Sequence, residues 1–354
     1  MKLQEYLRKH GIEKLITELH IQANRHEEYS NLVCLKYSQT ESPMESEIVR
    51  QCRGIILDED NDWKIVSYPY DKFFNYGEKH APTIDWNTAR VYEKLDGSLM
   101  VLYYYKGFWQ VQTSGRADAG GGVGSLPFSF RDLFWNTWKE LKYSLPLQTN
   151  RCYMFELCNP YNRVVVQHTE VSLTLCGVRN LDNLLEEDPL FWAEKYGWAT
   201  PSMYSLNSLP QIVKASEFLD PVKSEGYVVC DNNFTRIKIK SPNYVDIAFF
   251  AKQSFNSKRM VRLVVLNEGA EFLNYFPEWK EHYDGWLEKY NSLIANIEKD
   301  YCHFQQITDQ KDFALAIKHL PYSSILFSLR NGKTTSIKQA LCNTTIDKLQ
   351  QLLE

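Results

Sequence analysis

Short β-rich runs separated by turn residues fill the chain from about residue 30 to residue 244, and this pattern constrains the fold more than any other feature. The clearest example lies in 89–116, where Asp96-Gly97 and Lys106-Gly107 divide three runs rich in β-branched and aromatic residues. Such dipeptides form tight turns between antiparallel strands. The segment therefore predicts a three-stranded meander.

Further strands are predicted in two groups that follow along the chain. The first group comprises the runs 151–157, 162–167 and 171–178. The second is a hairpin of 225–230 and 234–240, joined by a turn that contains two asparagines.

Helical spacing of apolar residues marks the two ends of the chain and three interior segments. These segments are 2–24 (with a break at Gly11), 132–142, 189–197, 279–297 and a C-terminal helix over 337–353. Strands and helices are thus interleaved, and a chain of 354 residues suits two domains. We predict an α+β domain of antiparallel sheets flanked by helices over 1–245, followed by an all-helical domain over 246–354.

Composition argues against several classes of protein. No run reaches the roughly 18 apolar residues of a membrane helix, and the start of the chain does not have the pattern of a signal peptide. The eight cysteines include no CxxC pair, which argues against a zinc site or a disulfide framework. We therefore expect an intracellular, cytoplasmic protein with no membrane association. The net charge of −4 means that a polyanion would need a local concentration of cations.

Such a concentration occurs in the run FTRIKIKS, where Arg236, Lys238 and Lys240 alternate with isoleucines. Alternation on a strand places the three cations on one face and the isoleucines on the other. Like charges at this spacing repel each other unless an anion lies over them. The pattern is consistent with a phosphate-binding surface, although a solvated strand face would have the same sequence.

Three other residues could carry chemistry near this strand. Lys94 precedes the Asp96-Gly97 turn and could be an ordinary exposed lysine, or a nucleophile whose pKa is lowered by nearby cations. Glu156 lies in the apolar run YMFEL and Glu225 opens the strand that faces the basic one. Together these carboxylates could bind a ribose hydroxyl and a hydrated Mg²⁺. The run GGGVG lacks the P-loop pattern and is predicted to be a loop.

Six segments, taken in order, resemble the motifs of covalent nucleotidyltransferases, the superfamily of polynucleotide ligases and mRNA capping enzymes. They are RGIIL (53–57), KFFN (72–75), KLDGSL (94–99), MFELCNPYNRVVV (154–166), EGYVV (225–229) and KIKSPNY (238–244). The resemblance is to the T4 RNA ligase 1 type in particular. Leu99 stands where DNA ligases and capping enzymes usually have arginine, KFFN precedes the lysine, and KxKxxxY ends the series.

The resemblance implies a role for each matching residue. Lys94 would attack the α-phosphorus of ATP, release pyrophosphate and carry AMP, while Lys238 and Lys240 would stabilise the charge of the transferred group. Glu156 would bind the ribose, and Glu225 would hold Mg²⁺ or Mn²⁺. The other residues that the resemblance places around the nucleotide are Arg53, Lys72, Phe74, Glu93, Gly97, Arg116, Gly226 and Tyr244.

One position departs from the family pattern. The family has a lysine just before a glycine at the end of the third run of the predicted meander, and here that position is Ser114, followed by Gly115. Arg116 is a candidate for the missing charge.

The family resemblance implies an ATP-dependent RNA ligase that joins 5′-phosphate and 3′-hydroxyl RNA ends through lysine–AMP and RNA-adenylate intermediates. RNA repair, with tRNA among the substrates, is the expected role. One alternative is a GTP-dependent guanylyltransferase of the capping type, disfavoured by Leu99 and by the helical region after Tyr244. A second alternative, a non-catalytic RNA-binding module, is disfavoured because Lys94, Glu225 and Lys238 are present.

Two further expectations concern partners and the helical domain. Because the chain has no P-loop, we expect a separate kinase or phosphatase to prepare the RNA ends. The helical domain is expected to select RNA. A basic stretch at its start would contact the RNA, although salt bridges on a helix surface would explain these charges equally well. The stretch comprises Lys252, Lys258, Arg259 and Arg262.

Overall fold

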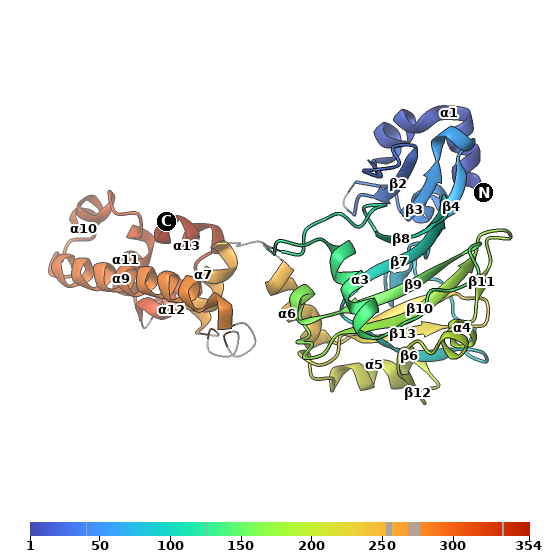
Figure 1. Ribbon diagram of the computed structural model, residues 1–354. Helices are drawn as coiled ribbons and strands as arrows, with labels where there is room; N and C mark the ends of the chain where they lie inside the picture. The colour runs from blue at the N-terminus through green and yellow to red at the C-terminus, as the bar shows by residue number, and fades with distance from the viewer. Residues whose placement is uncertain are drawn as a thin grey trace. The chain divides into compact units, whose positions relative to one another are not determined.

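A computed structural model of the chain (Figure 1) describes residues 1–39, 41–124, 126–252, 257–267, 269, 273, 277–334 and 336–354. The chain divides into two compact units, Met1–Ala251 and Lys252–Glu354. The first unit holds three β-sheets and several helices, and every described element of the second is helical, so the predicted α+β class is confirmed. Among these residues, no helix has the length and apolarity needed to cross a bilayer.

The first sheet is antiparallel and covered on one face by a helix. Its strands, in spatial order, are β1 (Ile21–Arg25), β2 (Leu32–Tyr37), β3 (Arg53–Asp58) and β4 (Lys64–Ser67). Helix α1 (Lys2–Leu19) breaks at Gly11, as predicted, and packs its buried leucines on the sheet together with α2 (Glu47–Gln51). The prediction of helix as far as residue 24 is wrong, because β1 pairs with β2 after the helix ends.

The second sheet is buried on both faces. Its spatial order is β11 (Glu186–Glu187), β10 (Ser172–Asn180), β9 (Arg151–Cys158), β7 (Ser98–Tyr105) and β8 (Phe108–Thr113). On β7, Met100 and Leu102 pack in the cluster beneath α3 (Phe130–Glu140) and α4 (Pro189–Tyr196), while Val101 and Tyr103 face the first sheet. Burial on both faces explains why the β7 sequence is continuously apolar.

The third sheet carries the basic strand. Its spatial order is β12 (Met203–Tyr204), β6 (Arg90–Lys94), β13 (Gly226–Cys230), β14 (Arg236–Lys240) and β5 (Phe74–Asn75), and only the β14–β5 pair is parallel. Ile237 and Ile239 pack towards α5 (Leu209–Glu217), so the predicted hairpin and the alternation of its side chains are confirmed.

Two strand predictions are wrong, and both errors involve Asp96. The second half of the predicted meander is confirmed, since β7 and β8 form an antiparallel hairpin at Lys106-Gly107. The first half is wrong, because β6 and β7 belong to different sheets and the chain crosses between them at Asp96-Gly97. The run 162–167 forms no strand, because the N–H groups of Val165 and Val166 donate to the Asp96 carboxylate at 2.8 Å instead of pairing in a sheet.

The second unit follows α6 (Pro242–Lys252). Its helices include α7 (Ser257–Leu266), α9 (Lys280–Phe304), α10 (Gln310–Ile317), α11 (Ser323–Arg330), α12 (Ile337–Cys342) and α13 (Ile346–Leu353). The predicted helix over 279–297 is confirmed by α9, whereas the C-terminal helix is divided in two between α12 and α13. Short 3₁₀ turns occupy Glu59–Asn61, Pro160–Asn162 and Pro277–Trp279.

The basic stretch at the start of this unit is only partly described. Lys258 forms an ion pair with Asp347 of α13 at 2.5 Å, which is the helix-surface salt bridge considered as the alternative. Arg262 is exposed. The side chains of Lys252 and Arg259 lie outside the described residues.

Candidate active site

Lys94 ends β6 at the crossing between the third and second sheets. Its Nζ lies 2.6 Å from Glu225 Oε2, and its side chain is 20% exposed. The side chain is therefore held by a carboxylate rather than free in solvent, because the crossing at Asp96-Gly97 leaves it between two sheets.

Glu225 joins Lys94 to the basic strand. Its Oε1 lies 2.6 Å from Nζ of Lys240, so one buried carboxylate contacts two ammonium groups. Burial acts to raise the pKa of Glu225, but the two lysines outweigh it and the pKa lies below its usual value.

Gly226 allows this arrangement, since it is aligned with Lys94 on one neighbouring strand and with Lys240 on the other. Its φ is +149°, and a Cβ there would lie 2.2 Å from the carbonyl oxygen of Ile239. A side chain at this position would push β13 away from β14. The glycine of the EGYVV motif is therefore required by the backbone.

Glu156 approaches the same place from β9 in the second sheet. Its Oε1 accepts a hydrogen bond from the N–H of Gly97 at 3.1 Å. Burial raises the pKa of Glu156 to about 7, with Lys94 acting in the opposite direction. The carboxyl group is thus ready to exchange a proton near neutral pH.

The pKa of Lys94 is raised, and the expectation that it is lowered is wrong. Burial acts to lower this pKa, but the carboxylates of Glu225 and Glu156 outweigh burial. The protein without substrate therefore holds Lys94 as an ammonium ion. The amine must lose a proton before it can act as a nucleophile.

The lowered pKa belongs instead to Lys238, at the middle of β14. Burial lowers the pKa of this amine, and neighbouring cations lower it further, to about 7. Those cations are Lys72, Lys94, Lys240 and Arg53. Such a cluster is unfavourable by itself and suits a ligand with several negative charges.

Arg53 presents a second sign of a missing anion. Its guanidinium lies over the rings of Tyr70 and Phe73, at 5.9 and 5.1 Å from their centroids. Its Nη1 atom is buried and has no hydrogen-bond partner among the described residues. A buried donor without a partner is costly, and a phosphate oxygen would satisfy it.

A cavity of about 350 Å³ opens beside Lys94, between the second and third sheets. Five of the predicted site residues line it: Arg53, Glu93, Lys94, Gly97 and Glu156. Its other walls include Tyr70, Phe73 and Val228, which are apolar surfaces suited to a nucleobase.

Other predicted residues support the site from outside the cavity. Lys72 lies over the rings of Tyr37 and Phe74, at 5.6 and 5.2 Å. Phe74 is buried beside β14, and it is the neighbouring Phe73 that lines the cavity. Alternation could not choose between two adjacent phenylalanines, since β5 has only two residues.

Tyr244 and Asp96 lock the turn that follows Lys94. The buried Tyr244 hydroxyl donates to Asp96 Oδ1 at 2.7 Å, while Oδ2 of the same carboxylate accepts the two N–H groups of the 163–168 segment. Sequence reasoning took Asp96 only for a turn residue. Its position inside KLDGSL was the signal that could have identified it.

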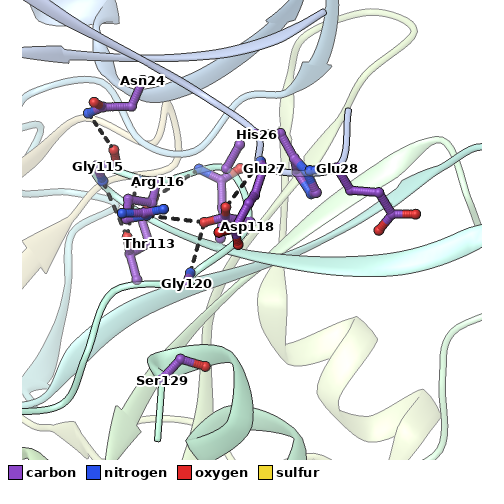
Figure 2. Close-up of polar contacts among 12 residues, drawn as sticks. Asn24, His26, Glu27, Glu28, Thr113, Gly115, Arg116, Asp118, Gly120 and Ser129 are labelled. Carbon is purple, nitrogen blue, oxygen red and sulfur yellow. Dashed lines mark hydrogen bonds and ion pairs between the residues drawn. The ribbon is translucent and has the colours of Figure 1, made fainter. Parts of the chain in front are cut away.

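Two arginines have local partners. Arg236 makes a buried ion pair with Glu186 at 2.6 Å, which ties β14 to the second sheet. Arg116 does not line the cavity and is paired with Asp118, its Nε lying 3.2 Å from Oδ1 (Figure 2). Arg116 thus has a carboxylate partner next to it in the chain and does not reach the cavity.

The arrangement can hold a polyphosphate beside a lysine nucleophile. No group of three histidine, cysteine or acidic side chains among the described residues is arranged to hold a metal ion. Mg²⁺ does not require such a group, because it is commonly bound by one or two carboxylates together with substrate phosphates and water. Glu225 is a suitable carboxylate.

Several known sequences are similar to this chain. A family model described as RNA ligase, of the T4 RNA ligase 1 type, matches residues 51–244. An RNA ligase of Rhodothermus phage RM378 is 38% identical over 165 residues, which cover 37% of this chain and 37% of the phage protein. A protein of Autographa californica nuclear polyhedrosis virus, provisionally described as a bifunctional polynucleotide kinase/RNA ligase, is 25% identical over 95% of this chain and 50% of its own length. The chain thus spans half or less of these curated relatives.

Solved structures with a similar arrangement are distant in sequence. An archaeal ATP-dependent RNA ligase is 13% identical with a TM-score of 0.45, over 75% of this chain and 68% of that chain. An RNA ligase of Naegleria gruberi with PPi is 13% identical with a TM-score of 0.34, over 53% of this chain and 66% of that chain.

Proposed function

This chain belongs to the RNA ligases of the T4 RNA ligase 1 type, and from this premise we propose that it is an ATP-dependent RNA ligase. Its proposed reaction joins a 5′-phosphate to a 3′-hydroxyl end of RNA. The observation that carries the proposal is the position of Lys94, held 2.6 Å from Glu225 at the edge of a cavity with a cluster of cations.

The proposed first step is covalent. Nζ of Lys94 releases a proton to solvent and attacks the α-phosphorus of ATP, so that an N–P bond forms, the P–O bond breaks and pyrophosphate leaves with the electron pair of that bond. Negative charge develops on the leaving pyrophosphate, and the cations Arg53, Lys238 and Lys240 are suitably placed to stabilise it.

The carboxylates have separate proposed roles. Glu156, reached from the second sheet and bound to the N–H of Gly97, would accept a ribose hydroxyl. Glu225 would hold a hydrated Mg²⁺ or Mn²⁺ once substrate phosphates compete for its two lysines. Such a metal ion would neutralise phosphate charge.

In the later steps, the 5′-phosphate of the RNA would take AMP from Lys94, and a 3′-hydroxyl would then displace AMP to form the phosphodiester.

Repair of broken RNA, tRNA included, is the proposed context. The baculovirus relative is described as combining a kinase with a ligase, and this chain spans half of it. We infer that a kinase or phosphatase outside these 354 residues prepares the RNA ends for ligation.

The test is to incubate the full chain with α-labelled ATP or GTP and Mg²⁺, then denature it and measure the label retained. We expect label from ATP in the native chain and none in Lys94→Ala. Lys64→Ala, an exposed lysine on β4, is the matched control and should label normally.

The other results have distinct meanings. Label from GTP alone would indicate a capping-type guanylyltransferase. No label from either nucleotide, in a chain that still binds RNA, would indicate a non-catalytic binding module. Labelling by ATP without sealing of a nicked RNA would contradict the ligase proposal beyond its first step.

A further inference from the structure

Two cations lie opposite each other on adjacent strands of the first sheet, next to the site. Lys36 of β2 is aligned with Arg53 of β3 at a β-bulge. Like charges directly opposite each other destabilise a sheet. Within the described part of the chain, neither side chain forms an ion pair with a carboxylate.

Arg53 connects this pair to the cavity. Its guanidinium lies over Tyr70 and Phe73 at the cavity wall, and Nη1 is buried there with no hydrogen-bond partner in the part of the chain that the structure describes. Lys36 is half-buried and lies on β2, the strand next to that of Arg53. The positive charge therefore continues within the first sheet, from Arg53 on β3 to Lys36 on β2.

Lys36 also borders the turn at Ser114-Gly115. Its Nζ lies 3.6 Å from the place that a Cβ on Gly115 would occupy. The turn is fixed against the first sheet, because Asn24 Nδ2 donates to the Gly115 carbonyl oxygen at 2.9 Å (Figure 2). A Cβ on Gly54, whose φ is +90°, would lie 3.0 Å from Ser114 Cα, so β3 is equally close.

Arg116, the cation at this turn that the sequence suggested, has a partner of its own. Asp118 is buried, and besides Arg116 it accepts hydrogen bonds from the N–H groups of Gly120 and Glu27 at 2.8 and 3.2 Å (Figure 2). These contacts hold the Arg116–Asp118 pair together and stabilise the Asp118 carboxylate, whose pKa is lowered. Among the described residues, Arg116 has a carboxylate partner beside Ser114 and Lys36 has none.

We propose that Lys36, together with Arg53, binds a terminal phosphate group at the Ser114-Gly115 turn. The inference rests on the proposed ligase function and adds a binding residue to it. Two substrates offer this chemistry: the polyphosphate of ATP and the 5′-phosphate of RNA. In either case the anion would relieve the repulsion between Lys36 and Arg53 and satisfy the buried Nη1.

The test measures binding and does not depend on turnover. The full chain carrying Lys94→Ala is combined with Lys36→Gln, with Lys36→Arg, or with the control Lys64→Gln. Calorimetry reports binding of ATP and of tripolyphosphate. Fluorescence anisotropy compares 5′-phosphorylated with 5′-hydroxyl RNA, and thermal melting verifies that each variant is folded.

We expect Lys36→Gln to weaken binding of one phosphate ligand by about tenfold, the effect of one charge-assisted contact. Lys36→Arg and Lys64→Gln should stay within about twofold of the parent, because each retains the charge at position 36. Loss for ATP and tripolyphosphate identifies the nucleotide as the source, and loss confined to 5′-phosphorylated RNA identifies the RNA end.

Unchanged binding of all ligands by a folded Lys36→Gln chain would overturn the inference. An equal loss for 5′-phosphorylated and 5′-hydroxyl RNA, with ATP unaffected, would also overturn it. The proposed function fails separately, if the chain with an intact Lys94 takes no label from ATP while its Lys36 variants still differ in phosphate binding.

Discussion

At the scale of single residues, the site combines groups whose protonation the fold has shifted in opposite directions. Carboxylates raise the pKa of Lys94, whereas burial and other cations lower the pKa of Lys238 to about 7. Lys94 is therefore protonated in the protein without substrate. Repulsion from the neighbouring cations instead favours the neutral form of Lys238. Both shifts depend on neighbours from other strands.

This difference predicts how stability depends on pH. The pKa of Lys238 is about 7 in the folded protein against 10.5 when unperturbed, so between these values the unfolded chain binds the extra proton. The free energy of unfolding should consequently rise with pH over this window, and the full cost of the buried charge applies below pH 7. We expect Lys238→Met to raise the melting temperature by a few degrees at pH 6, and the gain to shrink towards pH 9.5.

Thermal melts of both proteins across this range test the prediction. Glu156, whose pKa is raised to about 7, makes stability fall between pH 4.5 and 7. That effect is common to both proteins and cancels in the difference. Lys64→Met should show no pH-dependent gain, and a Lys238→Met difference that is constant with pH would contradict the assignment.

At the scale of elements, the close contact of β13 with β14 sets the distance between Lys94, Glu225 and Lys240. Gly226 opens β13 at the end of this contact where Lys240 lies, in a conformation that side chains rarely adopt. Gly285, in α9, is the opposite case, because a Cβ there would meet no atom within 4 Å.

Two alanine substitutions should therefore have opposite effects. Gly226→Ala should lower the free energy of unfolding by about 2–3 kcal/mol, through strain and the contact with Ile239, and should reduce labelling of Lys94. Gly285→Ala should raise stability by about 0.5–1 kcal/mol, because glycine is unfavourable inside a helix, and should leave labelling intact. Denaturant unfolding and the ATP-labelling assay measure both, and a Gly226→Ala chain of native stability would refute the role given to the glycine.

At the scale of the whole molecule, the two units have different compositions of elements and, we propose, different tasks. The candidate site lies wholly within the first unit. The assignment of RNA selection to the second unit stays a prediction. The ion pair between Lys258 and Asp347 shows that at least one cation of the basic stretch also has a structural partner.

Replacing Lys252, Lys258, Arg259 and Arg262 by glutamine should separate these tasks. We expect RNA sealing to fall about tenfold or more at physiological salt, since contacts with phosphates are lost, and labelling of Lys94 by ATP to remain. The control replaces four exposed lysines of the same unit: Lys299, Lys311, Lys318 and Lys333. Equal sealing by the two quadruple variants would contradict a specific role for the stretch.

Much of the secondary structure could be predicted from local patterns. The hairpin of β13 and β14, the helices α3, α4 and α9, and the break at Gly11 follow from side-chain alternation, helical spacing and a glycine. The meander could not be predicted correctly, because Asp96-Gly97 has the sequence of a hairpin turn. Only the distant partners of Asp96 make it a crossing between sheets.

The sequence alone determined the α+β class, the face of the basic strand, and the set of motifs that places the chain among the RNA ligases. These properties are local, or are carried by the order of residues along the chain. The tertiary structure decided which lysine is charged and which phenylalanine lines the cavity. It also decided that Arg116 is paired with a carboxylate whereas Lys36, within the described residues, is not. These properties depend on atoms brought together from separate sheets, because electrostatic interactions and burial act over a few ångströms in space whatever the separation in sequence.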